Sequence, residues 1–133
     1  MRGSATSRRR RILVIDHDLG LVELLRGLLI DEGYQPLTGL VLDAVAGLPA
    51  GERPELIILD VQFSQLGPDA ALLARLNGDA ALALIPLLLT ATDDKLLSRT
   101  AASLGRPRTA WIAKPFDLDA LLREVELLLA GPP

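Results

Sequence analysis

The chain has 133 residues, half of them hydrophobic, and a formal net charge of −3, which predicts one globular domain with a sizeable core. The absence of cysteine excludes disulfides and thiolate chemistry, and the negative charge, with only one Trp, one Tyr and two Phe, argues against direct nucleic-acid binding. No apolar stretch reaches the roughly 20 residues that cross a bilayer, and no signal peptide is recognisable, so we expect a soluble, cytoplasmic domain with no membrane contact.

The N-terminal segment is basic, because Arg8 to Arg11 form a positive run before the first apolar stretch. We expect residues 1–10 to be a flexible, solvated tail, with an anionic partner for the arginines as the alternative. Residues 11–130 are then the folded domain, and residues 131–133 are a tail or the start of a linker.

The first apolar stretch, residues 12–15, predicts a buried strand that ends on the polar residues 16–18. A helix is expected over residues 19–32, with Gly33 as its stop. Its apolar stripe would consist of Leu21, Leu24, Leu25, Leu28 and Leu29.

Residues 35–38 predict a weak strand that contains Pro36. Because proline has no N–H to donate to a neighbouring strand, this strand belongs at an edge of the sheet. A short helix over residues 41–48 follows, and the apolar residues 56–59 then predict a buried strand that finishes on Asp60.

A loop is expected over residues 61–67, and a helix over residues 68–76 begins on a proline, which suits a first helical turn. The next strand, residues 85–89, ends on Thr90.

Thr92 is expected to cap a helix that ends before Gly105. The last strand, residues 111–113, ends on Lys114, and Asp117 caps the final helix. The core stripe of that helix would consist of Leu118, Leu121, Leu122, Val125, Leu128 and Leu129, which leaves Leu127 outside it.

Short apolar strands thus alternate with helices, five of each, which is typical of an α/β fold with a doubly wound parallel sheet. The carboxyl ends of parallel strands meet at one rim, where such folds bind ligands. The residues at these ends are two carboxylates, a hydroxyl and an ammonium, a set that suits a phosphoryl group and a divalent cation. They are Asp16, Asp60, Thr90 and Lys114.

Four motifs in this order give the chain a resemblance to a known family over residues 12–130. They are Ile-Leu-Val-Ile-Asp16, Pro54-Glu-Leu-Ile-Ile-Leu-Asp60, Leu-Leu-Leu-Thr90-Ala91 and Trp111-Ile-Ala-Lys114-Pro115-Phe116. With this set the chain resembles the response regulator receiver domain, the chemotaxis-regulator-like phosphoprotein module of two-component phosphorelay signal transduction. The resemblance implies a flavodoxin-like fold with strand order 2-1-3-4-5, in agreement with an edge position for Pro36.

The resemblance also implies a role for each residue at the rim. Asp60 would accept a phosphoryl group from a histidine kinase and become an aspartyl phosphate, while Thr90 and Lys114 bind the phosphoryl oxygens. Mg²⁺ would be held by Asp16, Asp60 and the backbone carbonyl of Gln62.

A conformational switch and its partners are implied as well. Thr90 and Trp111 would form the switch, and the Lys114–Pro115 peptide would be cis. The switched surface comprises the helix after Thr92, the last strand and the final helix. It would bind a downstream effector, and a homodimer through this surface is predicted.

Two positions depart from the family pattern. His17 stands where the family has a second acidic metal ligand, and imidazole suits transition metals better than Mg²⁺. We therefore expect that Mg²⁺ binds more weakly, that Mn²⁺ replaces it, or that Asp18 moves in as a ligand. The alternative is that His17 merely lies exposed at the rim and has no role in metal binding. Ser64 replaces a proline in the loop after Asp60, which should leave this loop less rigid.

Three functions from different classes follow. The first is a receiver that accepts phosphate from a histidine kinase or phosphotransfer protein. The second is a degenerate receiver that serves as a phosphorylation-independent interaction module. The third is an enzyme, because Asp16 and Asp18 also look like the Asp-x-Asp motif of haloacid-dehalogenase-like phosphatases. That family needs a further acidic strand end after Lys114, and the chain has none, so we expect a protein that is not an enzyme.

Overall fold

The computed structural model describes residues 8–62 and 70–130, with side chains from residue 74 onward in the second range. Most of the predicted loop over residues 61–67, including Ser64, and the predicted helix start at Pro68 lie outside these residues. No helix in the described ranges has the length and hydropathy to span a bilayer.

Five parallel strands form one sheet in the order β2-β1-β3-β4-β5, as the family resemblance implies. The strands are β1 (Arg11–Ile15), β2 (Gln35–Leu37), β3 (Leu56–Asp60), β4 (Leu87–Ala91) and β5 (Thr109–Ala113). The edge position predicted for Pro36 is confirmed, because β2 pairs with β1 alone and Pro36 lies opposite Ile12. The fold class is therefore the doubly wound α/β fold expected from the motifs.

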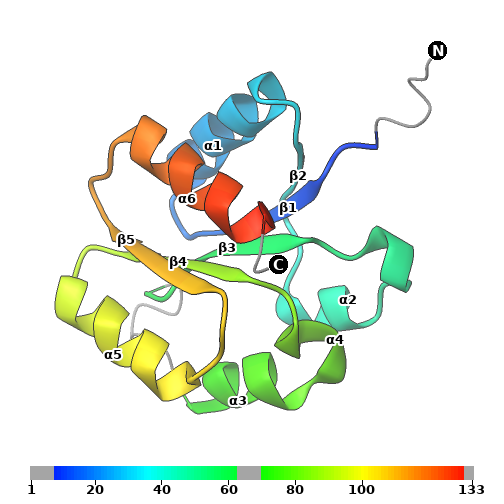
Figure 1. Ribbon diagram of the computed structural model, residues 1–133, viewed down its shortest axis with the longest axis vertical. Helices are drawn as coiled ribbons and strands as arrows, with labels where there is room; N and C mark the ends of the chain where they lie inside the picture. Colours follow the sequence, from blue (N-terminus) through cyan, green and yellow to red (C-terminus); the bar gives the residue numbers. More distant parts are fainter. Residues whose placement is uncertain (1–7, 63–69, 131–133) are drawn as a thin grey trace.

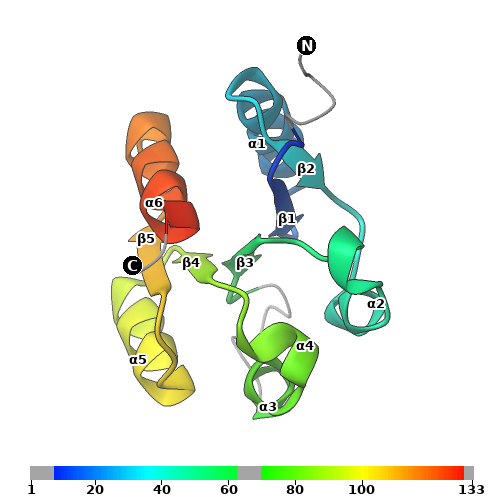
Figure 2. The same cartoon turned by 45° about the vertical axis from the view of Figure 1, so that its right-hand side comes forward.

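Helices cover both faces of the sheet, with α1 and α6 together on one face and α2 to α5 on the other (Figures 1 and 2). The α-helices are α1 (Leu19–Asp31), α2 (Leu42–Ala46), α3 (Ala70–Gly78), α4 (Ala80–Ala83), α5 (Asp94–Leu104) and α6 (Leu118–Ala130), and a 3-10 helix, η2, spans Ala50–Glu52. The described residues thus contain six α-helices, one more than the five expected. The additional turn, α4, forms because the Asp79 side chain accepts a hydrogen bond from the Ala81 amide at 2.7 Å and restarts the helix after Gly78.

Each face of the sheet packs its own apolar cluster, since side chains alternate along a strand. Ile12, Val14 and Ile58 point towards α1 and α6, whereas their neighbours Leu13 and Ile57 point to the opposite face. All but a trace of each of these side chains is buried. The two clusters fix the register of the strands and therefore the positions of the residues at their carboxyl ends.

Two details of the helices differ from expectation. Leu24 was predicted to lie in the core stripe of α1 but is 52% exposed, because the helix rotates its buried side towards Leu25 and Leu29. The N-cap of α5 is Asp93, not Thr92: its carboxylate accepts from the amides of Lys95 and Leu96. A carboxylate at this position also interacts favourably with the positive end of the helix.

The basic run leads directly into the sheet, because β1 begins at Arg11, the last of its arginines. Arg11 is 8% exposed, and its Nε donates to the Arg53 carbonyl at 2.8 Å. The Glu55 carboxylate forms ion pairs with Arg8, Arg10 and Arg11. This carboxylate lies just before β3, so the arginines are held at the amino end of the sheet.

Candidate functional site

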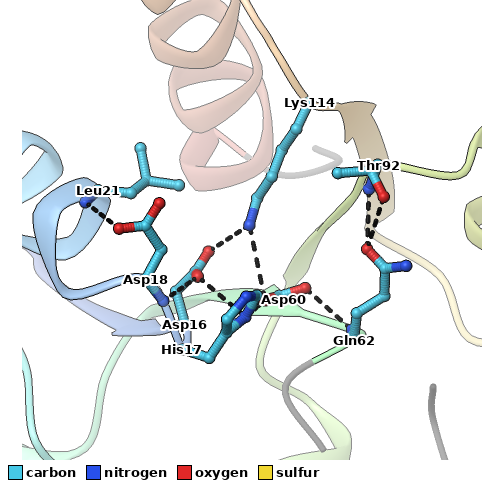
Figure 3. A network of polar contacts seen from close by, with 8 residues as sticks. All are labelled: Asp16, His17, Asp18, Leu21, Asp60, Gln62, Thr92 and Lys114. Atoms are coloured by element: carbon cyan, nitrogen blue, oxygen red, sulfur yellow. Dashed lines mark hydrogen bonds and ion pairs between the residues drawn. The ribbon is translucent and has the colours of Figure 1, made fainter. Parts of the chain in front are cut away.

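The carboxyl ends of four strands bring the predicted site residues together at one rim of the sheet, where Figure 3 shows Asp16, Asp60 and Lys114. Asp16 follows β1, Asp60 ends β3 and Lys114 follows β5. Thr90, in β4, lies directly opposite Asp60 in the parallel register, so the two side chains are on the same face. All four residues singled out at the strand ends therefore belong to one region.

The centre of this region is a pair of carboxylates with two basic partners. The Lys114 ammonium lies 2.8 Å from Asp16 Oδ2 and 3.6 Å from Asp60 Oδ2. The imidazole of His17 contacts Asp60 Oδ2 through Nδ1 at 2.5 Å and lies 3.6 Å from Asp16 Oδ1. Asp60 is completely buried, and a buried carboxylate requires such partners to offset its desolvation.

Backbone amides hold the second oxygen of each carboxylate. The Gln62 N–H donates to Asp60 Oδ1 at 2.9 Å, and the Asp18 N–H donates to Asp16 Oδ1 at 2.9 Å. The Lys114 N–H donates to the Ala91 carbonyl at 2.7 Å, and the Lys114–Pro115 peptide is cis, as the resemblance implied. The loops after β1, β3 and β5 thus orient the charged groups.

Thr90 supplies a buried hydroxyl that has no hydrogen-bond partner within the described part of the chain. Its residue is 2% exposed and its Oγ1 is unpaired, whereas buried hydroxyl groups in folded proteins are normally satisfied. The hydroxyl shares a sheet face with Asp60 and can donate to a ligand oxygen placed beside that carboxylate. An anion with several oxygens, such as a phosphoryl group, would satisfy it.

One cluster at the rim has the composition of a metal site. Single ligand atoms of Asp16, His17 and Asp60 all lie within 4.8 Å of one another. Two carboxylate oxygens and an imidazole nitrogen are ordinary ligands for a divalent cation, so the residues fit such an ion. Asp18 lies outside the cluster, because its side chain caps α1 by accepting from the Leu21 amide.

Sequence reasoning missed a contact between two loops of the site. The Gln62 side-chain oxygen accepts from the Thr92 amide at 2.9 Å and from the Thr92 hydroxyl at 3.1 Å. This contact joins the loop after β3 to the loop after β4 (Figure 3). Gln62 lies two positions after Asp60, and Thr92 lies two positions after Thr90. This equal spacing was the one feature of the sequence that could have indicated the contact. The contact also explains why Thr92 does not cap α5.

An apolar cleft of about 420 Å³ adjoins the metal-type cluster. The residues that line it include Asp16 and His17 of the cluster, together with Leu19 and Val41. Both apolar side chains are largely exposed, at 76% and 61%. The site therefore borders an open hydrophobic surface formed by α1 and the segment between β2 and α2.

Trp111 lies on the edge strand β5 in register with Leu89, on the same side of the sheet as α5. Its side chain is 44% exposed. The indole is thus at the surface in this structure, two residues before β5 ends at Ala113, and its predicted role in a switch stays a prediction.

Curated relatives match the chain along most of its length. Response regulator MprA from Mycobacterium avium (strain 104) is 36% identical over 123 residues, which cover 90% of this chain and 50% of that protein. The proteins of the same name from Mycobacterium ulcerans and Mycobacterium bovis match with equal identity and coverage. The chain spans about half the length of the curated relatives it matches. No protein-family model matches it.

Solved structures show the same fold. The chemotaxis protein CheY4 of Vibrio cholerae superposes with a TM-score of 0.73 at 19% identity, over 91% of this chain and 99% of that one. A putative response regulator from Chloroflexus aurantiacus gives a TM-score of 0.74 at 24% identity, over 92% and 99% of the two chains.

Proposed function

Since the chain belongs, by fold and by sequence, to the response regulator receiver domains, we propose that it accepts a phosphoryl group on Asp60 and thereby changes a protein-interaction surface. The proposed donors are a histidine kinase or a phosphotransfer protein. The observation that carries the proposal is the buried Asp60 carboxylate beside the unpaired Thr90 hydroxyl, with the Lys114 ammonium 3.6 Å away.

The reaction is the transfer of a phosphoryl group between two nucleophiles. An Asp60 oxygen attacks phosphorus and forms a new P–O bond, while the bond to the donor breaks and its electron pair leaves with the donor. Lys114 and Thr90 bind the phosphoryl oxygens and neutralise the charge that develops on them. The Gln62 N–H holds the other oxygen of Asp60 in place.

A divalent cation, when bound by Asp16 and Asp60, supplies the additional positive charge that an anionic nucleophile and an anionic donor require. The backbone carbonyl of Gln62 is a further proposed ligand. Mg²⁺ binding is expected to be weaker than usual, or replaced by Mn²⁺, because His17 is part of the cluster.

The phosphoryl donor needs a docking surface next to Asp60. The apolar cleft beside His17, lined by Leu19 and Val41, suits such a partner, because exposed apolar patches commonly mark protein interfaces. We propose that the kinase or phosphotransfer protein docks here.

The second proposed surface lies over α5, β5 and α6, where Trp111 and Leu127 are exposed. It would bind the downstream effector or a second copy of the chain after Thr90 and Trp111 rearrange. Because Trp111 is the only tryptophan, a change in its emission upon phosphorylation would report this switch directly. The cytoplasmic location stays a prediction, as does the absence of direct nucleic-acid binding.

One observation favours the degenerate receiver as the second candidate. His17 contacts Asp60 Oδ2 at 2.5 Å and so competes for the oxygen that attacks phosphorus. The phosphatase alternative gains no such support, because Asp18 caps α1 and does not join the cluster.

The test is incubation with acetyl phosphate in the presence of Mg²⁺ or Mn²⁺, followed by intact mass, with Asp60→Ala treated in parallel. A phosphoryl adduct on the wild type alone supports the receiver function. No adduct with either ion contradicts it and favours the interaction module.

A further inference from the structure

We propose that His17 is a metal ligand, and that it makes this a mixed nitrogen and oxygen site that prefers a later first-row divalent ion, of the Co²⁺ to Zn²⁺ class, over Mg²⁺. The inference rests on the proposed function, because it specifies the ion of the same site. Asp16 and Asp60 supply the oxygen ligands.

The first support is the placement of the imidazole. His17 Nδ1 is the atom that faces both carboxylates, at 2.5 Å from Asp60 and 3.6 Å from Asp16. An ion that enters between these oxygens therefore meets the nitrogen as its third ligand. The His17 side chain is 47% exposed, so the ring lies at the solvent side of the cluster and an ion can reach it from water.

The second support is the order of the surrounding groups. One oxygen of Asp60 and one of Asp16 accept from the backbone amides of Gln62 and Asp18. Such outer hydrogen bonds orient carboxylate ligands. The buried, unpaired Thr90 hydroxyl beside Asp60 is an independent sign that this end of the sheet is completed by a ligand.

The preference among ions follows from the chemistry of the donors. Mg²⁺ requires a tight octahedral shell of oxygen atoms and gives up water reluctantly. An imidazole nitrogen suits Zn²⁺, Ni²⁺ and iron, and affinity at such sites rises from Mn²⁺ through Co²⁺ towards Zn²⁺. With His17 in place of an acidic side chain, the site lacks an oxygen ligand that Mg²⁺ needs. It has instead a nitrogen ligand that later ions prefer.

The chain provides a direct reporter, because His17 is its only histidine. In ¹⁵N-edited NMR of the whole chain, the imidazole gives one set of signals without assignment. Saturating Zn²⁺ should shift the Nδ1 resonance, and Co²⁺ should shift or broaden the ring protons beyond detection, whereas Mg²⁺ at the same concentration should leave them nearly unchanged. Unchanged imidazole signals with both Zn²⁺ and Co²⁺ would overturn the proposal.

A selectivity measurement provides the second arm. Calorimetric titrations with Co²⁺ and Mg²⁺ give the ratio of their dissociation constants, in which a general change of charge cancels. His17→Asp should reduce the preference for Co²⁺ at least about tenfold, the loss that even outer partners of a ligand produce when they are replaced. Asp31→Asn, at the far end of α1, alters the charge without touching the cluster and should leave the ratio unchanged. An unchanged ratio in His17→Asp would contradict the proposal.

The same samples separate this inference from the proposed function. If the imidazole responds to Co²⁺ and Zn²⁺ but no ion supports a phosphoryl adduct, phosphoryl transfer is wrong and the ligand assignment stands. If an adduct forms with Mg²⁺ while the imidazole signals never respond, the function stands and the ligand assignment is wrong.

Discussion

The two ends of the sheet each carry a cluster of charged residues, but among the described residues only the charges at the amino end are also bonded to backbone groups in distant parts of the fold. At the amino end, Glu55 accepts from Arg10 at 2.5 Å and from the Arg11 backbone amide at 3.3 Å. At the carboxyl end, Asp16 and Asp60 share Lys114 and His17. The two clusters contain similar numbers of charged groups. They differ in the hydrogen-bond partners that these groups have.

The amino end satisfies its charges with the backbone and with distant parts of the chain. Arg10 donates to the Leu129 carbonyl at 3.1 Å and Arg108 donates to the Leu128 carbonyl at 2.7 Å, so two arginines cap the end of α6. Arg108 Nε is buried without a partner among the described residues, but only the carboxyl end leaves a buried hydroxyl unpaired beside a carboxylate, that of Thr90 next to Asp60. The amino end therefore contributes to stability, and the carboxyl end retains unmet hydrogen-bonding capacity for a ligand.

The largest effect is expected for Lys114→Gln. Loss of the ammonium that contacts both carboxylates should slow formation of the phosphoryl adduct about a hundredfold, the typical cost of removing one charge-stabilising donor. The rate is measured by intact mass over time with acetyl phosphate. Lys95, the only other lysine, is exposed on α5, and Lys95→Gln should react at the wild-type rate; equal rates for both variants would contradict the role of Lys114.

A smaller effect on the rate, about tenfold, is expected for Thr90→Val, because the hydroxyl is an uncharged donor to the phosphoryl oxygens and such a hydrogen bond is worth about 1.4 kcal/mol. The variant should also be about 1 kcal/mol more stable in urea, since an unpaired buried hydroxyl is removed. Thr100→Val is the matched control: the Thr100 hydroxyl is buried but donates to the Leu96 carbonyl at 2.7 Å. This control should lose stability and keep its rate, and a destabilised Thr90→Val would argue that its hydroxyl is paired.

At the other end, Glu55→Gln should affect stability alone. The buried Arg11 loses its charged partner, so the free energy of unfolding should fall by about 1–2 kcal/mol. Urea unfolding measures the change, and Glu52→Gln, an exposed neighbour in η2, should be nearly neutral. The adduct rate of Glu55→Gln should match the wild type; a large loss of rate would show that the two ends are not independent.

The smallest effect is a dependence of stability on acid pH. Burial alone would raise the pKa of Glu55, but hydrogen bonds from the Arg11 amide and the Arg10 side chain, with their charges, hold this pKa below its ordinary 4.5. The folded pKa is lower than the unfolded one, so the contribution is complete above pH 4.5 and is lost as the pH falls through the folded pKa. The difference in unfolding free energy between wild type and Glu55→Gln should therefore shrink from neutral pH to about pH 3. A difference that stays constant would contradict this ion pairing.

Much of the fold could be predicted because each strand is a short apolar run between polar residues. Strand order was predicted through the family resemblance, and Pro36 gave independent support for an edge strand. The α4 turn was missed because its four residues are apolar and run on towards the next strand, and only the Asp79 side chain marks where the turn begins. The rotation of α1 away from Leu24 depends on neighbouring helices, which a stripe of leucines does not specify.

The members of the site were predictable because they end strands, but their pairing was not. The sequence placed Asp16, Asp60 and Lys114 at one rim, yet the contact of His17 with Asp60 depends on the path of the loop after β1. The contact between Gln62 and Thr92 depends on two loops at once. The ion pairs between the basic run and Glu55 were not foreseen for a similar reason, since Glu55 lies more than forty positions away in the chain.

We propose that Asp60, at the open end of the sheet, is the phosphoacceptor. The most direct test is to treat the protein with acetyl phosphate and a divalent ion, trap the acyl phosphate with borohydride, and sequence the resulting peptides by mass spectrometry. We expect homoserine at position 60 and an unmodified peptide around Asp16. Homoserine at another position, or a phosphoryl group on His17, would contradict it.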